Sequence, residues 1–87
     1  MSDARMNRIE RLSLMINKVE DAQADVLAAR NAARDIAVSM IEVVGDTSNA
    51  NGMDAVTLIQ SARDHLDQQA GILDMVIFNL DRFIRSL

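Results

Sequence analysis

The chain has 87 residues, a formal net charge of −4 and no cysteine, proline, tryptophan or tyrosine. Its 49% apolar and 25% charged residues exclude a disordered polar tail. The lack of cysteine excludes disulfide scaffolds, thiolate zinc sites and cysteine nucleophiles. The acidic balance and the scarcity of aromatic side chains argue against a nucleic-acid binder.

No stretch of the sequence predicts a membrane span or a targeting segment. The most apolar stretch, 72–80, is short and is interrupted by Asp74 and Asn79, whereas a bilayer needs about 20 apolar residues. Residues 1–12 carry charges and no apolar segment, unlike a signal peptide. We therefore expect a cytoplasmic location.

The first predicted element is an amphipathic helix over about residues 3–44. No glycine or proline lies between Met1 and Val44, and apolar residues recur every three or four positions, as in a helix with one buried face. The pattern drifts near Ala22, which favours an eleven-residue repeat there over a strict heptad. The sequence leaves open whether the helix is continuous at that point.

Residues 45–52 predict the connection between two helices. Gly45 follows the last apolar residues of the first helix and suits a left-handed C-cap. Asn51 is the predicted N-cap of the next helix, because Asp54 follows three residues later. We expect the second helix over about residues 53–86, and one helical-hairpin domain over residues 1–87.

The second predicted helix has the most regular pattern in the chain. Two series recur every seven residues: Ile59, Leu66, Leu73, Leu80 and Leu87, and Val56, Arg63, Ala70, Ile77 and Ile84. This spacing is typical of a coiled-coil seam. The predicted fold class is all-α, an antiparallel two-helix hairpin in which residue i lies opposite about residue 97 − i.

Apolar side chains exceed what one hairpin can cover, because two helices share only one seam. The C-terminal half of the second helix is apolar on most sides, which is typical of a helix buried all round. We therefore expect a homo-oligomeric bundle, a four-helix dimer or a higher even assembly, or docking to another protein. The predicted interface residues are Leu12, Ile16, Leu66, Leu73, Val76, Ile77, Phe78, Leu80, Phe83 and Ile84.

No catalytic, cofactor or metal site is predicted. His65, the single histidine, follows Asp64 directly. Neighbours on a helix do not face each other, so these two residues cannot form a triad with Ser61. Carboxylate pairs such as Asp64 and Asp67 lack the Glu-x-x-His partners of di-iron bundles.

An arginine-rich layer is predicted at the middle of the hairpin. The register places Arg30 opposite Asp67 and Arg34 opposite Arg63, with Asp64 adjacent. One interpretation is an ion-pair layer that sets the register. In the other, three guanidinium groups against two carboxylates leave a positive surplus that binds a small anion. The candidate ligand-binding residues are then Arg30, Arg34, Arg63 and Asp67.

The layout resembles the helical-hairpin dimers of the Rop type, plasmid proteins that bind paired RNA loops; the resemblance covers the plan alone. The favoured function is a non-enzymatic small interaction protein that inhibits, adapts or chaperones another protein, as phage, plasmid and bacterial accessory proteins do. The alternative is an oligomer that sequesters a small anionic ligand such as a nucleotide through arginines at subunit junctions. A minor alternative is Rop-like RNA binding by Arg5, Arg8, Arg11 and Lys18.

Overall fold

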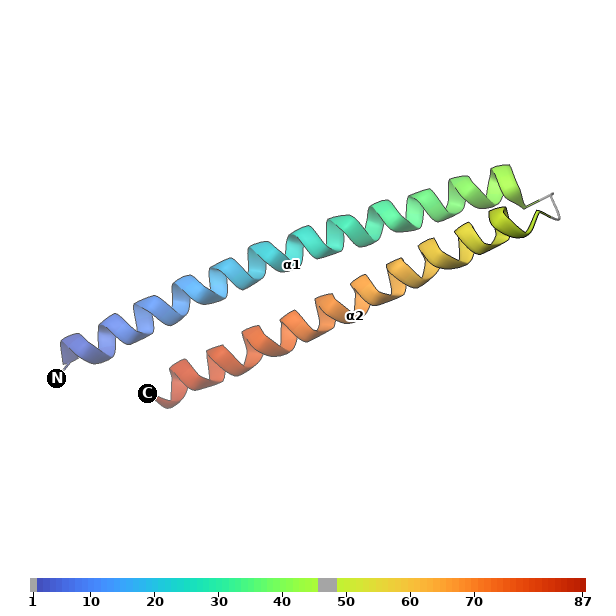
Figure 1. Cartoon of the computed structure of the whole chain (residues 1–87). Helices are drawn as coiled ribbons and strands as arrows, with labels where there is room; N and C mark the ends of the chain where they lie inside the picture. Colours follow the sequence, from blue (N-terminus) through green and yellow to red (C-terminus); the bar gives the residue numbers. More distant parts are fainter. Residues whose placement is uncertain (1, 46–48) are drawn as a thin grey trace.

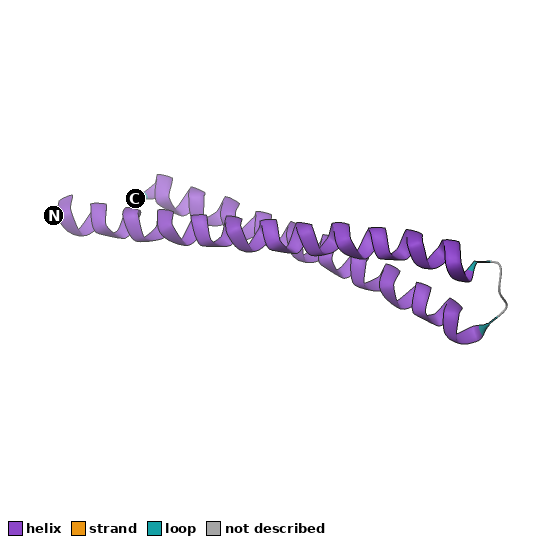
Figure 2. Cartoon of the chain, turned by 90° about the horizontal axis from the view of Figure 1, so that it is seen from above, coloured by secondary structure: helices purple, strands orange, loops and turns teal. Residues whose placement is uncertain are grey.

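The computed structural model describes residues 2–45 and 49–87, and it confirms the predicted all-α hairpin. Helix α1 (Ser2–Val44) packs antiparallel against helix α2 (Ala50–Ser86), with both chain ends at one end of the molecule (Figure 1). The hairpin measures 69 × 15 × 14 Å and its radius of gyration is 19.7 Å, against about 12 Å for a compact chain of this length. Seen from above, the two helices cross at a shallow angle (Figure 2). No helix of the described part is long and apolar enough to cross a membrane.

Helix α1 is continuous, and a strict heptad spacing runs along it. One series of shielded side chains alternates at three- and four-residue steps along the whole helix: Ile9, Leu12, Ile16, Val19, Gln23, Val26, Arg30, Ala33, Ala37, Met40 and Val44. Leu27 and Asn31, beside this series, are also partly shielded. The expected eleven-residue repeat near Ala22 is therefore wrong, because Ala22 is exposed and Gln23 occupies the shielded position. The apolar pattern drifts there since polar side chains hold two positions of an unbroken heptad.

The two seven-residue series of α2 line the side that faces α1. Every member of both series is partly or fully buried, including Arg63. Burial in a two-helix molecule comes from the other helix, so these residues and the shielded residues of α1 form the contact between the helices. We call this contact the seam.

The N-terminus of α2 lies earlier than expected. The side-chain oxygen of Asn49 accepts hydrogen bonds from the backbone N–H of Asn51 at 2.9 Å and of Gly52 at 3.2 Å. Asn49 is thus the N-cap and α2 begins at Ala50, so the prediction that Asn51 caps a helix starting near Met53 is wrong. Asn51 lies inside the first turn, where its own N–H needs a partner.

The predicted left-handed cap at Gly45 is also wrong. No described glycine has a positive φ, and the Gly45 N–H donates to the Ile41 carbonyl at 2.7 Å, which extends the helical pattern by one residue. A Cβ at this position would lie 2.5 Å from the same oxygen, so glycine is needed there for space. Residues 46–48 of the predicted connection lie outside the described residues.

Contacts between the helices confirm the expected register. Arg30 Nη1 lies 2.8 Å from Asp67 Oδ1, and Gln23 Nε2 donates to the Ala70 carbonyl at 3.1 Å. Near the connection, a Cβ on Gly52 would clash with the side chain of Val44. The helices therefore approach closely at this end, with residue i of α1 beside about residue 97 − i of α2.

Candidate interaction surfaces

The hairpin has almost no hydrophobic core. The only buried apolar residues among those described are Ala33, Ala37, Val56 and Ala70, and none of the large side chains is fully buried. Large apolar side chains remain exposed along both helices: Met6, Leu14, Met15, Ile36, Val38, Ile41, Val43, Met53, Leu58, Ile72, Met75, Val76, Phe78 and Phe83. A folded domain normally packs such side chains against one another.

The exposed area is correspondingly large. The chain exposes 6476 Å², whereas a compact folded protein of the same mass exposes about 5,100 Å². The excess, roughly 1,400 Å² per copy, exceeds the ~800 Å² that each partner contributes to a standard protein interface. The surface of one hairpin thus has enough excess area for a large interface.

Exposed large apolar side chains lie at both ends of the hairpin. Eight lie toward the chain ends, where the sequence indicated a surplus, and six near the connection are 46–79% exposed: Ile36, Val38, Ile41, Val43, Met53 and Leu58. The sequence analysis missed this second group, which is exposed because each helix has a single neighbour. An apolar side chain outside the seam stays open at either end.

Two rows of exposed positions form what we call the apolar face. The rows repeat every seven residues: Met15, Ala22, Ala29, Ile36 and Val43 on α1, and Ala55, Ala62, Gln69, Val76 and Phe83 on α2. The seam residues of each helix are spaced alternately by three and by four residues. Each residue of a row comes directly before a seam residue that lies four positions after the previous one. Residues at this position on two antiparallel helices lie on the same side of the pair. Gln69 is the one polar residue among them, and all but half-buried Ala55 are exposed.

The opposite edge of the seam is more polar. Here Arg30 meets Asp67, and Gln23 Nε2 donates to Asp74 Oδ1 at 2.5 Å. Further polar positions along this edge are Ser13, Glu20, Arg34, Gln60 and Asp81, and the apolar residues Met6, Leu27, Ile41 and Met53 share it. The two sides of the hairpin therefore differ in polarity, although each carries large apolar side chains.

A second surface, which we call the acidic groove, lies near the terminal end of α2. Its lining residues are Ile16, Glu20, Asp74, Met75, Ile77, Phe78, Asn79 and Asp81. Phe78 and Met75 are 60% and 63% exposed, and the Arg82 guanidinium carbon lies 5.7 Å from the centre of the Phe78 ring. Of the three carboxylates of the groove, Asp81 pairs with Arg85 Nη2 at 2.9 Å and Asp74 accepts from Gln23. Exposed apolar side chains beside these carboxylates suit a partner that presents both apolar and basic groups.

The arginine layer has no surplus charge. Arg30 pairs with Asp67, and Arg63 Nη2 lies 3.0 Å from Asp64 Oδ1. Arg34 Nε lies 3.7 Å from Asp35 Oδ1, a carboxylate that the sequence interpretation left out. With Asp35 counted, three carboxylates lie beside the three arginines, so these contacts do not support the predicted positive surplus.

The Arg30 guanidinium donates hydrogen bonds to two side chains, Asn31 and Asp67. Its Nε and Nη2 donate to Asn31 Oδ1 at 3.2 and 3.0 Å, while Nη1 donates to Asp67. The Asn31 contact was missed because i, i+1 residues of a helix rarely face each other. With its donors engaged in this way, Arg30 stabilises the register and offers few free hydrogen bonds to an anion.

The predicted interface residues separate into two groups. Seven lie partly buried in the seam: Leu12, Ile16, Leu66, Leu73, Ile77, Leu80 and Ile84. The other three are exposed, with Val76 and Phe83 on the apolar face and Phe78 in the acidic groove. Sequence reasoning missed the row from Met15 to Val43, whose seven-residue spacing was its available signal.

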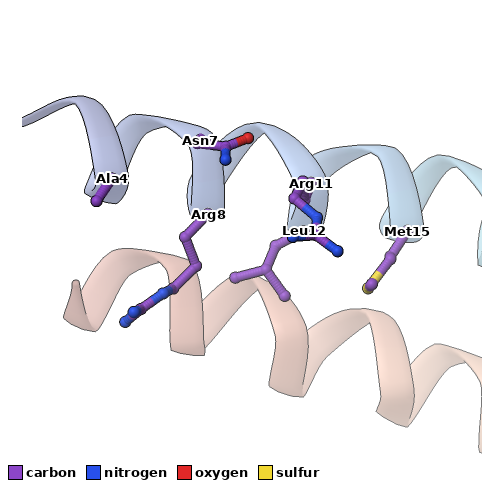
Figure 3. Close-up of a pocket in the computed structure, with 6 residues that line it drawn as sticks. All are labelled: Ala4, Asn7, Arg8, Arg11, Leu12 and Met15. Atoms are coloured by element: carbon purple, nitrogen blue, oxygen red, sulfur yellow. The ribbon is translucent and has the colours of Figure 1, made fainter.

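The first turns of α1 carry the basic residues considered for RNA binding. Figure 3 shows a hollow lined by Ala4, Asn7, Arg8, Arg11, Leu12 and Met15, with Leu12 and Met15 directed toward α2. Arg8 and Arg11 thus adjoin the terminal end of the apolar face. Neither Arg5 nor Lys18 lines this hollow.

Asp64, the acidic neighbour of His65, is engaged by an arginine. The Asp64 carboxylate accepts hydrogen bonds from Arg63 Nε and Nη2, at 3.2 and 3.0 Å. Within residues 2–45 and 49–87, no three histidine or acidic side chains gather as metal ligands would.

Comparison with known proteins gives no relative. No model of a protein family matches the chain, and neither a curated protein nor a solved structure matches it.

Proposed function

We propose that the chain is a non-enzymatic interaction protein whose hairpins self-associate into a helical bundle. In this proposal the bundle acts on another protein as an inhibitor, adaptor or chaperone, with the cytoplasm as the expected location. The observation that carries the proposal is the mismatch between a core of four small residues and the large apolar side chains left in contact with solvent.

Energetics support self-association. Full burial of one large apolar side chain contributes about 1.5–3 kcal/mol. The apolar face holds five such side chains that are 38–79% exposed: Met15, Ile36, Val43, Val76 and Phe83. Covering them contributes on the order of 5 kcal/mol per copy, a large part of the usual stability of a small domain.

The acidic groove supports the second part of the proposal. Phe78 and Met75 occupy helix positions away from the apolar face, so they stay accessible when that face is covered. Glu20 and Asp74 give the groove its negative charge, while the third carboxylate, Asp81, is paired with Arg85. We propose that the client protein presents apolar and basic side chains to it. Anion sequestration is not carried forward, because each arginine of its site has its own carboxylate.

Light scattering with two matched variants tests self-association. We expect the native chain to have a mass that is a multiple of 9.6 kDa. Ile36→Glu, on the apolar face, should shift the protein toward the monomer or unfold it, because it places a charge in the interface. Val38→Glu should change the mass little, although Val38 is 53% exposed and Ile36 only 48%.

Comparing the two variants distinguishes an interface residue from a residue that is merely exposed to solvent. In a lone hairpin both substitutions fall on open surface and have equally small effects. A native chain that stays at 9.6 kDa at all concentrations would overturn the proposal.

A further inference from the structure

We propose that two hairpins pair through the apolar face in opposite directions, about a twofold axis that passes near Ala29 and Gln69. This inference rests on the proposed self-association and adds the face and the orientation. The observed register places Ala29 and Gln69 at the same level of the hairpin. A twofold axis at that level lays the connection of one copy over the terminal end of the other.

Side-chain sizes fit this orientation. On each helix, the axis pairs a row residue with a residue of the same row in the second copy. The resulting pairs are Met15 with Val43, Ala22 with Ile36, Ala62 with Val76, and Ala55 with Phe83, while Ala29 and Gln69 meet their own copies. Three of the four unlike pairs join a small residue to a large one, as close packing of facing layers requires.

The two faces can be laid together in one other way, in which the copies run in the same direction and α1 of each lies over α2 of the other. The resulting pairs are Met15 with Phe83, Ala22 with Val76, Ile36 with Ala62, and Val43 with Ala55. Three of these four pairs also join a small residue to a large one, so side-chain size fits both directions.

Charge favours oppositely directed copies. The terminal end, residues 1–18 and 80–87, carries six basic and three acidic side chains: Arg5, Arg8, Arg11, Lys18, Arg82 and Arg85 against Asp3, Glu10 and Asp81. The described residues of 40–57, around the connection, carry two acidic side chains and no basic one: Glu42 and Asp54. Oppositely directed copies bring the basic end of each beside the acidic end of the other. Copies that run in the same direction stack like charges.

Single-cysteine cross-linking tests the orientation, since the native chain has no cysteine. Each variant is treated with a short bis-maleimide, and linked dimers are counted on a denaturing gel. Ala29→Cys should link to itself in most molecules. Its neighbour Ala28→Cys, exposed on the outer side of α1, should link at least tenfold less.

Mixed samples give the direction of pairing. An equal mixture of Met15→Cys and Val43→Cys chains should give the mixed dimer, while Met15→Cys alone should not link.

Linking between Met15→Cys and Phe83→Cys chains, with none at Ala29→Cys, would overturn the proposal in favour of copies that run in the same direction. A multiple of 9.6 kDa in light scattering without any of these links would overturn the proposed face and leave self-association standing. A 9.6 kDa particle would overturn both.

Discussion

Asn49 shows how one side chain sets where α2 begins. Its side-chain oxygen satisfies the N–H groups of Asn51 and Gly52, two of the donors that a helix leaves free at its first turn. The sequence offered two asparagines two residues apart, and propensity alone does not choose between them. Sequence reasoning therefore predicted a cap near this point, and only the observed hydrogen bonds identified which residue provides it.

Replacing Asn49 with alanine should lower the free energy of unfolding by about 1 kcal/mol, because two backbone donors lose their acceptor. The matched substitution Asn51→Ala removes no capping oxygen, and its effect should stay within about 0.5 kcal/mol. Thermal unfolding followed by circular dichroism at one fixed protein concentration measures both changes. A larger loss from Asn51→Ala than from Asn49→Ala would contradict the assigned cap.

At the scale of the helices, the sequence predicted α2 better than α1. The seam of α2 is apolar at nearly every position, so its seven-residue series is readable directly. On α1, Gln23 and Arg30 occupy seam positions and interrupt the apolar pattern. Their partners lie on α2, at Ala70, Asp74 and Asp67, and a contact between distant residues cannot be read from local spacing.

Replacing Gln23 with leucine should stabilise the protein by about 1 kcal/mol, since a half-shielded polar side chain in the seam gives way to an apolar one. The Ala70 carbonyl that Gln23 contacts lies inside α2, where the helix itself supplies a donor. The measured melting temperature should rise by about 4–8 °C. Asn17→Leu, at an exposed position of the same helix, is the control and should give no such rise. A fall in melting temperature for Gln23→Leu would show that the polar contact matters more than burial.

At the scale of the whole molecule, the sequence predicted the hairpin and an excess of apolar side chains at its terminal end, and it missed the exposed ones near the connection. Apolar residues are densest along the chain at the terminal end. The structure exposes large apolar side chains at both ends, and the row from Met15 to Val43 and the row from Ala55 to Phe83 share one side. The sequence correctly placed the arginine layer opposite Asp67. It left Asp35, which lies near Arg34, out of the count of charges.

The acidic groove gives a prediction at this scale. A fluorescent amphipathic helix of leucine and lysine should bind the native protein, while a leucine and glutamate counterpart should not, because the groove is rimmed by Glu20, Asp74 and Asp81. Phe78→Ser should weaken binding of the lysine peptide about tenfold, the effect of losing ~1.4 kcal/mol of contact. Fluorescence anisotropy measures the affinities.

Leu14→Ser is the control for the groove, because Leu14 is also 60% exposed and does not line it. This variant should bind the lysine peptide as tightly as the native protein. Equal loss of affinity in both variants would assign the binding to general charge attraction and not to the groove.

Because few side chains are buried within one hairpin, the stability of the folded protein should depend on its concentration. A chain whose interior consists of Ala33, Ala37, Val56 and Ala70 obtains little of its folding energy from within. Under the proposed self-association, every dilution lowers the melting temperature, because partner binding adds to stability in proportion to the logarithm of concentration. Copies made in small numbers would then be cleared by proteases, and only expression above a threshold would build a lasting pool.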